Sequence, residues 1–237
     1  MAQSFFIWNG VDCRSMGITL TGPAPIVRPE ERVRHVEIPG RSGDLTQLEG
    51  EEVFNSYIQT VTIHVKGGFR VREVYKWLRG SGYVTFSGEP EKRQQARIIG
   101  AVTLNKHSRN LDKWVGEVQF YCQPFKELLR PVDVEITNSG SVVRNNGDVT
   151  AKPLWKITAS GTSVVIACGG RDLTVTNVSS GQVVLVDSEV MEILNADRTD
   201  TLTKNSLGGF PVLAPGDNEV TGSGWSKVVI EKRERYL

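Results

Sequence analysis

Strict alternation of apolar and polar residues runs through three separate segments of the chain. In TVTIHVK, Val61, Ile63 and Val65 face one way, and the residues between them are polar. The segments KWVGEVQFYC, at 113–122, and VDVEIT, at 132–137, show the same period of two. Successive side chains of a strand point to opposite faces, so each segment indicates a half-buried antiparallel strand. The sequence therefore predicts a mainly β protein.

One segment breaks this alternation and has the spacing of a helix instead. Apolar residues of VREVYKWLRG recur at the i, i+3, i+4 and i+7 positions that form one helical stripe. They are Val71, Val74, Tyr75 and Leu78. Gly80 stands where helices commonly end in a left-handed residue. We expect a single long helix, at about residues 70–80, packed against the first sheet.

The residue pattern of the chain changes after Phe125. The segment QPFKELLRP, at 123–131, is polar and bounded by prolines, which predicts a connector. Short strand-like segments then follow one another about every nine residues, a spacing typical of a β-sandwich without helices. They are SVVIAC, LTVTNV, QVVLVD and EVMEIL, with turns such as GGRD and SSGQ between them. We therefore expect two domains, at 1–130 and 131–237.

Composition and charge argue against several classes of function. Lys and Arg number 28 against 27 Asp and Glu, so the net charge of +1 does not favour a dedicated binder of nucleic acid or of membrane surfaces. The start MAQSFFIWNGVD lacks a basic region and a long apolar stretch, so we expect no signal peptide and a soluble protein made in the cytoplasm. Three widely spaced cysteines, Cys13, Cys122 and Cys168, predict buried reduced thiols rather than disulfides or a zinc site.

No catalytic motif is visible in the sequence. A nucleophile elbow, a phosphate-binding loop, a dinucleotide fingerprint, a zinc-protease helix and a calcium loop are all missing. The histidines His35, His64 and His107 lie in unrelated segments. A glycosidase built from distant carboxylates stays open, but we expect no enzyme, no cofactor and no metal site.

A glycine-rich stretch, HVEIPGRSGDLTQLEGEEVF, follows an early apolar run. Pro39 presets the second position of a turn and Gly40 can take the positive φ of the third, so residues 38–41 predict a type II turn. Gly43 and Gly50 allow further conformations that a Cβ would forbid. The stretch lacks the Lys-Ser/Thr pair and the helix start that a phosphate loop needs.

Aromatic residues raise an alternative function. Trp114 and Trp155 lie within strand patterns and are expected in the core, whereas Trp225 follows a glycine-rich turn. Trp225 is therefore the one candidate for stacking against a sugar. The alternative hypothesis is a carbohydrate-binding β-sandwich module that contributes to recognition of the host cell surface.

Several segments, in order from Phe6 to Gly224, resemble one known family. They are FIWNGVDC, VEIPGRSGDL, VYKWLRGSGYVTFSGEP, VGEVQFYCQPF, NNGDVTAKPLWKITASG and FPVLAPGDNEVTGSG. Their order and spacing resemble the distal tail protein family of long-tailed, non-contractile bacteriophages and prophages. The resemblance covers nearly the whole chain.

The resemblance implies a structural protein of the virion, at the tip of the phage tail. The first domain would be a tail-tube-like β-sandwich with one flanking helix, six copies of which close into a ring around the DNA exit channel. The second would be a galectin-like β-sandwich. Implied partners are further copies of the chain, the tail tube protein, the hub or fibre protein and the tape measure protein, with DNA only passing through, no membrane, and assembly in the cytoplasm of the host bacterium.

The resemblance also gives the glycine-rich stretch a role. In tail-tube-like domains, a long loop between early strands reaches a neighbouring subunit or ring. We therefore expect polar intersubunit contacts from Arg41, Asp44, Glu49, Glu51 and Glu52, with Arg41 paired to an acidic group of the neighbour. The alternative is a solvated loop without a partner.

Overall fold

A computed structural model describes residues 4–67, 70–107 and 112–237 of the chain. Most of its regular structure consists of β-strands, with one α-helix among the described residues. The predicted mainly β fold class is thus confirmed. The chain forms two compact units, residues 1–129 with Leu237 and residues 130–236.

The first unit contains the only α-helix of the described residues and a series of strands. Its strands are β1 (Phe6–Trp8), β2 (Val11–Asp12), β3 (Ile18–Leu20), β4 (Val33–Val36), β5 (Leu45–Leu48), β6 (Tyr57–Lys66), β7 (Ser81–Phe86), β8 (Lys92–Ile99), β9 (Leu104–Lys106) and β10 (Lys113–Leu128). Its helices are the short 3-10 helix η1 (Cys13–Met16) and the α-helix α1 (Val71–Trp77).

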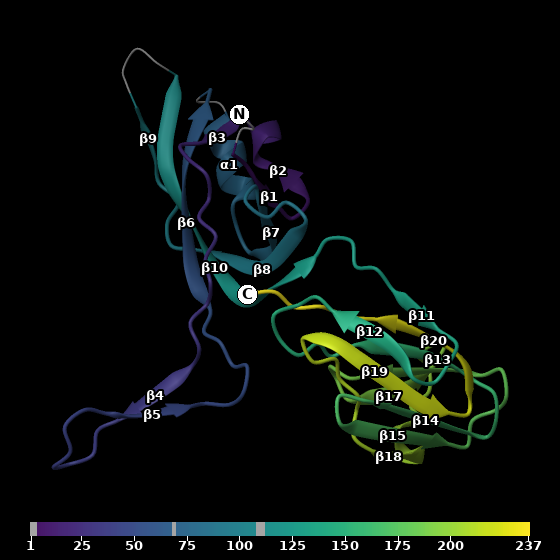
Figure 1. Cartoon of the computed structure of the whole chain (residues 1–237). Coiled ribbons are helices and arrows are strands. Elements are labelled where there is room, and N and C mark those ends of the chain that lie inside the picture. The colour runs from purple at the N-terminus through teal and green to yellow at the C-terminus, as the bar shows by residue number, and fades with distance from the viewer. Residues whose placement is uncertain (1–3, 68–69, 108–111) are drawn as a thin grey trace. The chain divides into compact units, whose positions relative to one another are not determined.

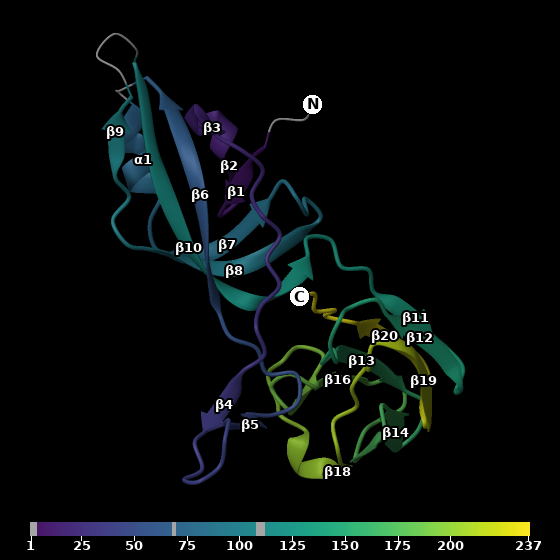
Figure 2. The same cartoon turned by 60° about the vertical axis from the view of Figure 1, so that its left-hand side comes forward.

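Eight of these strands form one antiparallel sheet. Their order is β2-β1-β7-β8-β10-β6-β3, and β9 pairs with β10. Strands β6 and β10 run side by side through it (Figures 1 and 2), from Tyr57 opposite Cys122 to Lys66 opposite Lys113. Helix α1 covers one face, where Val74 joins the same apolar core as Phe120. The other face of β6 and β10 carries mostly polar residues.

Helix α1 is shorter than the sequence predicts. It ends at Trp77, although the N–H of Leu78 still donates to the carbonyl of Val74 at 2.8 Å. The backbone leaves the helical conformation at Leu78, with φ −78° and ψ 71°. The ring of Trp77, the last helical residue, stacks on Phe6 with centroids 5.7 Å apart. Gly80 has the predicted left-handed conformation, with φ +79°.

The predicted connector at 123–131 is wrong over most of its length. Strand β10 continues to Leu128, and its register against β8 shifts between Cys122 and Lys126. Pro124 lies inside this bulge, where its missing N–H breaks no regular ladder hydrogen bond. The side chain of Gln94 follows the irregular backbone and donates to the carbonyl of Gln123. The strand therefore continues past a proline that the sequence pattern reads as part of a connector.

The second unit is a sandwich of two five-stranded sheets. Their orders are β11-β20-β13-β16-β17 and β12-β19-β14-β15-β18. The strands are β11 (Val134–Ile136), β12 (Ser141–Asn145), β13 (Leu154–Ala159), β14 (Ser163–Cys168), β15 (Arg171–Thr176), β16 (Val183–Asp187), β17 (Glu192–Asn195), β18 (Ser206–Gly208), β19 (Gly216–Ser223) and β20 (Trp225–Glu231), with a short 3-10 helix η3 (Thr203–Asn205).

The inner faces of both sheets share one apolar core, as the alternating pattern predicts. Trp155 is fully buried in it, in agreement with its predicted core position. Its indole N–H donates to the hydroxyl of Ser188 at 3.1 Å, and that hydroxyl donates to the carbonyl of Pro211 at 2.7 Å. The buried indole is therefore fully hydrogen-bonded.

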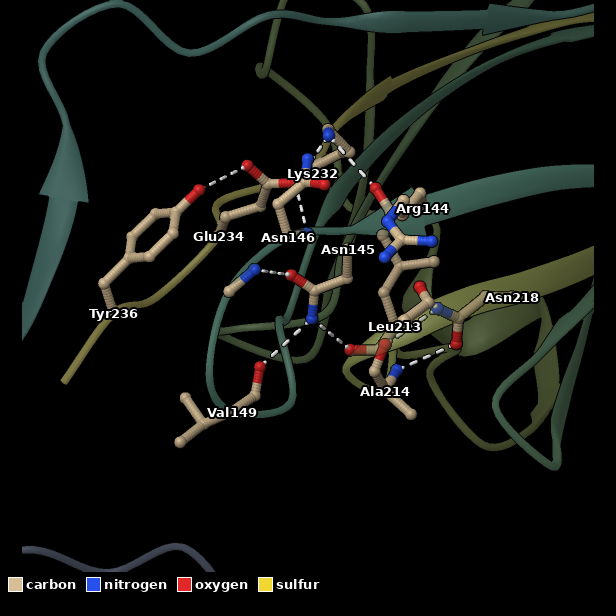
Figure 3. Close-up of polar contacts among 12 residues, drawn as sticks. Arg144, Asn145, Asn146, Val149, Leu213, Ala214, Asn218, Lys232, Glu234 and Tyr236 are labelled. Atoms are coloured by element: carbon tan, nitrogen blue, oxygen red, sulfur yellow. Dashed lines mark hydrogen bonds and ion pairs between the residues drawn. The ribbon is translucent and has the colours of Figure 1, made fainter.

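A buried polar network holds the last residues of the second unit against the loop after β12 (Figure 3). The carboxylate of Glu234 accepts hydrogen bonds from the backbone N–H of Asn146 at 2.9 Å and from the hydroxyl of Tyr236 at 3.0 Å. The ammonium of Lys232 pairs with the same carboxylate. At the end of β12, the side chain of Asn145 donates to the carbonyls of Val149 and Leu213 at 3.1 and 3.0 Å.

Candidate assembly surfaces

The glycine-rich stretch folds into a β-hairpin, which we call the arm (residues 30–55). Strands β4 and β5 pair only with each other among the described residues, from Val33 opposite Leu48 to Val36 opposite Leu45 (Figure 1). At the base, the N–H of Asn55 donates to the carbonyl of Glu30 at 2.8 Å. The stretch is therefore a two-stranded ribbon rather than an irregular loop.

Each face of the arm presents one aliphatic pair to its surroundings. Val33 and Leu48 share one face, and Val36 and Leu45 share the other. Leu48 is 64% exposed and Leu45 is 36% exposed. An isolated two-stranded hairpin is marginally stable in water. The arm thus combines exposed apolar groups with two free strand edges, which are features of an interaction element.

The predicted turn at the tip of the arm is present. The N–H of Arg41 donates to the carbonyl of Ile38 at 3.1 Å, and Gly40 has φ +82°. A positive φ at the third residue, with this hydrogen bond, defines the type II turn. Arg41 and Asp44 are exposed beside the turn.

The structure separates the five predicted interface residues into two groups. Arg41 and Asp44 precede β5, whereas Glu49, Glu51 and Glu52 follow it near the base of the arm. All five side chains are exposed. Their predicted role in intersubunit contacts stays a prediction.

A pocket of about 900 Å³ lies at the other end of β6 from the arm. Sequence reasoning missed it, because its residues come from four separate segments. Four basic side chains line it, those of Arg14, Lys66, Arg70 and Lys113. His64 and the acidic Asp112 line it as well. We call it the basic pocket.

Strand register creates the charge of the basic pocket. Lys66 on β6 stands directly opposite Lys113 on β10. The side chain of Arg70 lies over Gly17, where a Cβ would come 2.7 Å from a guanidinium nitrogen. Gly17 therefore leaves room for a third cation. Arg14 is already paired, because its guanidinium binds the carboxylate of Asp12.

His64 lies beside these cations on the same face of β6. Its Nε2 is 2.8 Å from the hydroxyl of Thr21. Burial lowers the pKa of His64, and the charges of Lys113 and His107 lower it further. The imidazole is therefore neutral near pH 7, so the positive charge of the pocket comes from the lysines and arginines.

Trp225, the candidate for sugar contact, is half-buried at the start of β20. Its ring packs against the core of the second unit, and its N–H donates to the carbonyl of Val165 at 3.1 Å. The polar atom of the indole thus already has a partner within the unit.

No group of three or more His, Cys, Asp or Glu side chains in the described part of the chain is placed to hold a metal ion. Within residues 4–67, 70–107 and 112–237, no helix is long and apolar enough to cross a membrane.

One solved structure has a similar fold over both units. It is that of the SPP1 Dit protein, described as a paradigm of the hub adsorption apparatus in phages that infect Gram-positive bacteria. The fold of the chain thus agrees with the mainly β fold that the sequence resemblance implies. The two chains align over 100% of each, with a TM-score of 0.81 and 17% sequence identity.

A second structure, of lower similarity, is that of a phage baseplate. A structure of the phage p2 baseplate, in its activated conformation with Sr, aligns with 97% of this chain and 98% of its own, at 8% identity and a TM-score of 0.40. That score is too low to support an argument. No protein-family model matches the sequence, and no curated protein matches it either.

Proposed function

We propose that the chain is a structural protein of a phage tail tip, a distal tail protein without enzymatic activity. Copies of it form a ring, most simply of six, around the channel through which DNA leaves. The ring connects the tail tube to the hub or fibre protein. The observation that carries this proposal is the agreement of the whole fold, across both units, with SPP1 Dit at a TM-score of 0.81.

The first unit supplies the ring in this proposal, and the second, as a galectin-like sandwich, faces outward. A closed ring of identical subunits needs two different, complementary patches on each copy. The arm, with exposed apolar pairs and free edges, is suited to be one of them. Arg41, Asp44 and the acidic residues after β5 then contact the neighbouring subunit.

The partners follow from this place in the virion. They are further copies of the chain, the tail tube protein, the hub or fibre protein and the tape measure protein, assembled in the cytoplasm of the host. DNA only passes through the ring. A net charge of +1 supports this, because strong DNA binding depends on a surplus of Lys and Arg that neutralises phosphates.

The size of the particle in solution tests the proposal. Light scattering on the purified full chain should give a mass near six times 26.2 kDa, and negative-stain images should show rings with a central opening. A protein that stays monomeric at high concentration and binds neither the tail tube protein nor the hub protein would contradict it.

A double variant tests the role of the arm. Replacing Arg41 and Asp44 by Ala should weaken the ring, because both side chains lie beside the turn at its tip. The matched control is the exposed ion pair Arg144–Asp217 of the second unit, replaced by Ala at both positions. If the arm variant assembles as well as the control, the arm is a solvated hairpin without a partner.

A further inference from the structure

Two patches of opposite charge lie at opposite ends of the first unit's longest strand pairing. One is the acidic run, defined as Glu49, Glu51 and Glu52, where three exposed carboxylates occupy four positions. The backbone is bent there, with Gly50 at φ +139° and Glu52 at φ +55°. A positive φ is uncommon for a residue other than glycine, so the run is held in a specific shape.

The other patch is the lysine pair, Lys66 and Lys113, at the mouth of the basic pocket. Directly opposed like charges destabilise an antiparallel ladder. Neither ammonium forms a salt bridge with a carboxylate among the described residues. Bringing the carboxylates of Glu49 and Glu51 to these two ammonium groups would offset the repulsion within both patches.

The acidic run of a chain cannot reach the lysine pair of the same chain. Strand β6 spans ten residues, Tyr57–Lys66. At a rise of about 3.3 Å per residue, its two ends lie about 30 Å apart. Glu52 lies only five positions before Tyr57, a separation that spans at most about 18 Å when fully extended. Glu49 is held in the arm, because its N–H donates to the carbonyl of Arg32 at 3.1 Å. The acidic run can therefore meet a lysine pair only on another copy.

We infer that the acidic run of one copy docks in the basic pocket of a second copy, where its carboxylates pair with Lys66 and Lys113. The contact is head to tail, because the two patches differ and lie at opposite ends of β6. Contacts of this kind close into rings when the rotation between copies allows it. The inference rests on the proposed ring and names the site that receives the arm.

Charge reversal with mixing tests the contact. One variant carries Lys66→Glu and Lys113→Glu, and the other carries Glu49→Lys, Glu51→Lys and Glu52→Lys. Each variant alone should fail to assemble, because like charges then meet at every contact. A 1:1 mixture should assemble again, since the acidic run of the first variant meets the intact pocket of the second, and the reversed run meets the reversed pocket. The control carries Lys76→Glu and Lys204→Glu, two exposed lysines elsewhere, and should assemble normally.

Two results of this experiment would overturn the inference. The first is normal assembly of the lysine variant by itself. The second is folded variants that both fail to assemble and stay separate when mixed. In either case, a ring formed by the wild-type chain would still support the proposed function. Failure of the docking inference can therefore be distinguished from failure of the proposed function.

A peptide measurement keeps the inference testable even if the wild-type chain stays monomeric. The probe is a fluorescein-labelled peptide of residues 46–56, and the receptor is the full chain with Glu49→Gln, Glu51→Gln and Glu52→Gln, whose own run cannot compete. Affinity should fall with added salt, and by about tenfold or more when Lys66→Gln and Lys113→Gln are introduced into the receptor. Equal binding of a peptide with Gln at the three Glu positions would overturn the inference.

Discussion

Replacing Glu234 by Ala should destabilise the second unit by about 3 kcal/mol. Glu234 is 7% exposed, and its carboxylate accepts hydrogen bonds from Asn146 and Tyr236 and pairs with Lys232. Hydrogen bonds to charged groups contribute about 1.5–3 kcal/mol each, and breaking a buried pair costs about 3–5 kcal/mol. Water can still reach Lys232, whose side chain is 12% exposed, so the lower end of that range is expected.

Hydrogen exchange read by mass spectrometry measures this loss in the second unit separately from the first. Amides of β13 lie in the core of the sandwich and exchange when the unit opens. A loss of 3 kcal/mol should speed their exchange about a hundredfold. The matched control is Glu189→Ala, which removes a 38% exposed carboxylate paired with Arg235 and should cost under about 0.5 kcal/mol.

Equal exchange of β13 in the two variants would refute this reasoning. Faster exchange confined to residues 144–149 would refute it as well, because the network would then fix only the loop and not the sandwich.

Three further predictions concern stability and reactivity. Gly116→Ala should lower the free energy of unfolding in urea by more than about 2 kcal/mol, because its Cβ would lie 2.0 Å from the carbonyl oxygen of Thr103. Gly22→Ala is the control and should leave that free energy unchanged, because the space around Gly22 is open. Equal effects of the two substitutions would contradict the packing argument. Burial alone would raise the pKa of Asp187 and Glu234, but hydrogen bonds and cations hold the pKa of both below their ordinary values. The stability that the two carboxylates contribute is therefore present above about pH 4.5 and is lost as the pH falls through their folded-state pKa values. A variant with Asp187→Asn and Glu234→Gln should lose less stability between neutral and acid pH than the wild type, and an unchanged pH dependence would contradict the assignment. Burial raises the pKa of Cys122 to about 12 and of Cys168 to about 11, so neither thiol should react with iodoacetamide at pH 8 until the protein unfolds, and rapid labelling of the native chain would contradict their burial.

Local patterns in the sequence predict the strands and their faces well. Val61, Ile63 and Val65 are buried on β6 as the alternation requires. The sequence is less informative about where helices and strands end, because contacts with distant residues affect those positions. Helix α1 stops at Trp77, which stacks on Phe6 from a distant strand, and β10 passes through Pro124 because a bulge accommodates the proline.

The two assembly surfaces also differ in how far the sequence predicts them. The type II turn at the tip of the arm depends on Pro39 and Gly40, which are adjacent, and it is predicted from them alone. The lysine pair depends on the register between β6 and β10, whose residues are separated by 47 positions along the sequence, from Lys66 to Lys113. Alternation places both lysines on the polar face of a strand but does not say that they stand opposite each other.

Immunogold electron microscopy of phage particles produced from the genome that encodes this chain tests the central claim most directly. An antibody against the chain should label the distal end of the tail, at the junction between the tail tube and the tip, and nowhere else on the particle. Label on the capsid or along the tube, or particles without label, would contradict a distal tail protein.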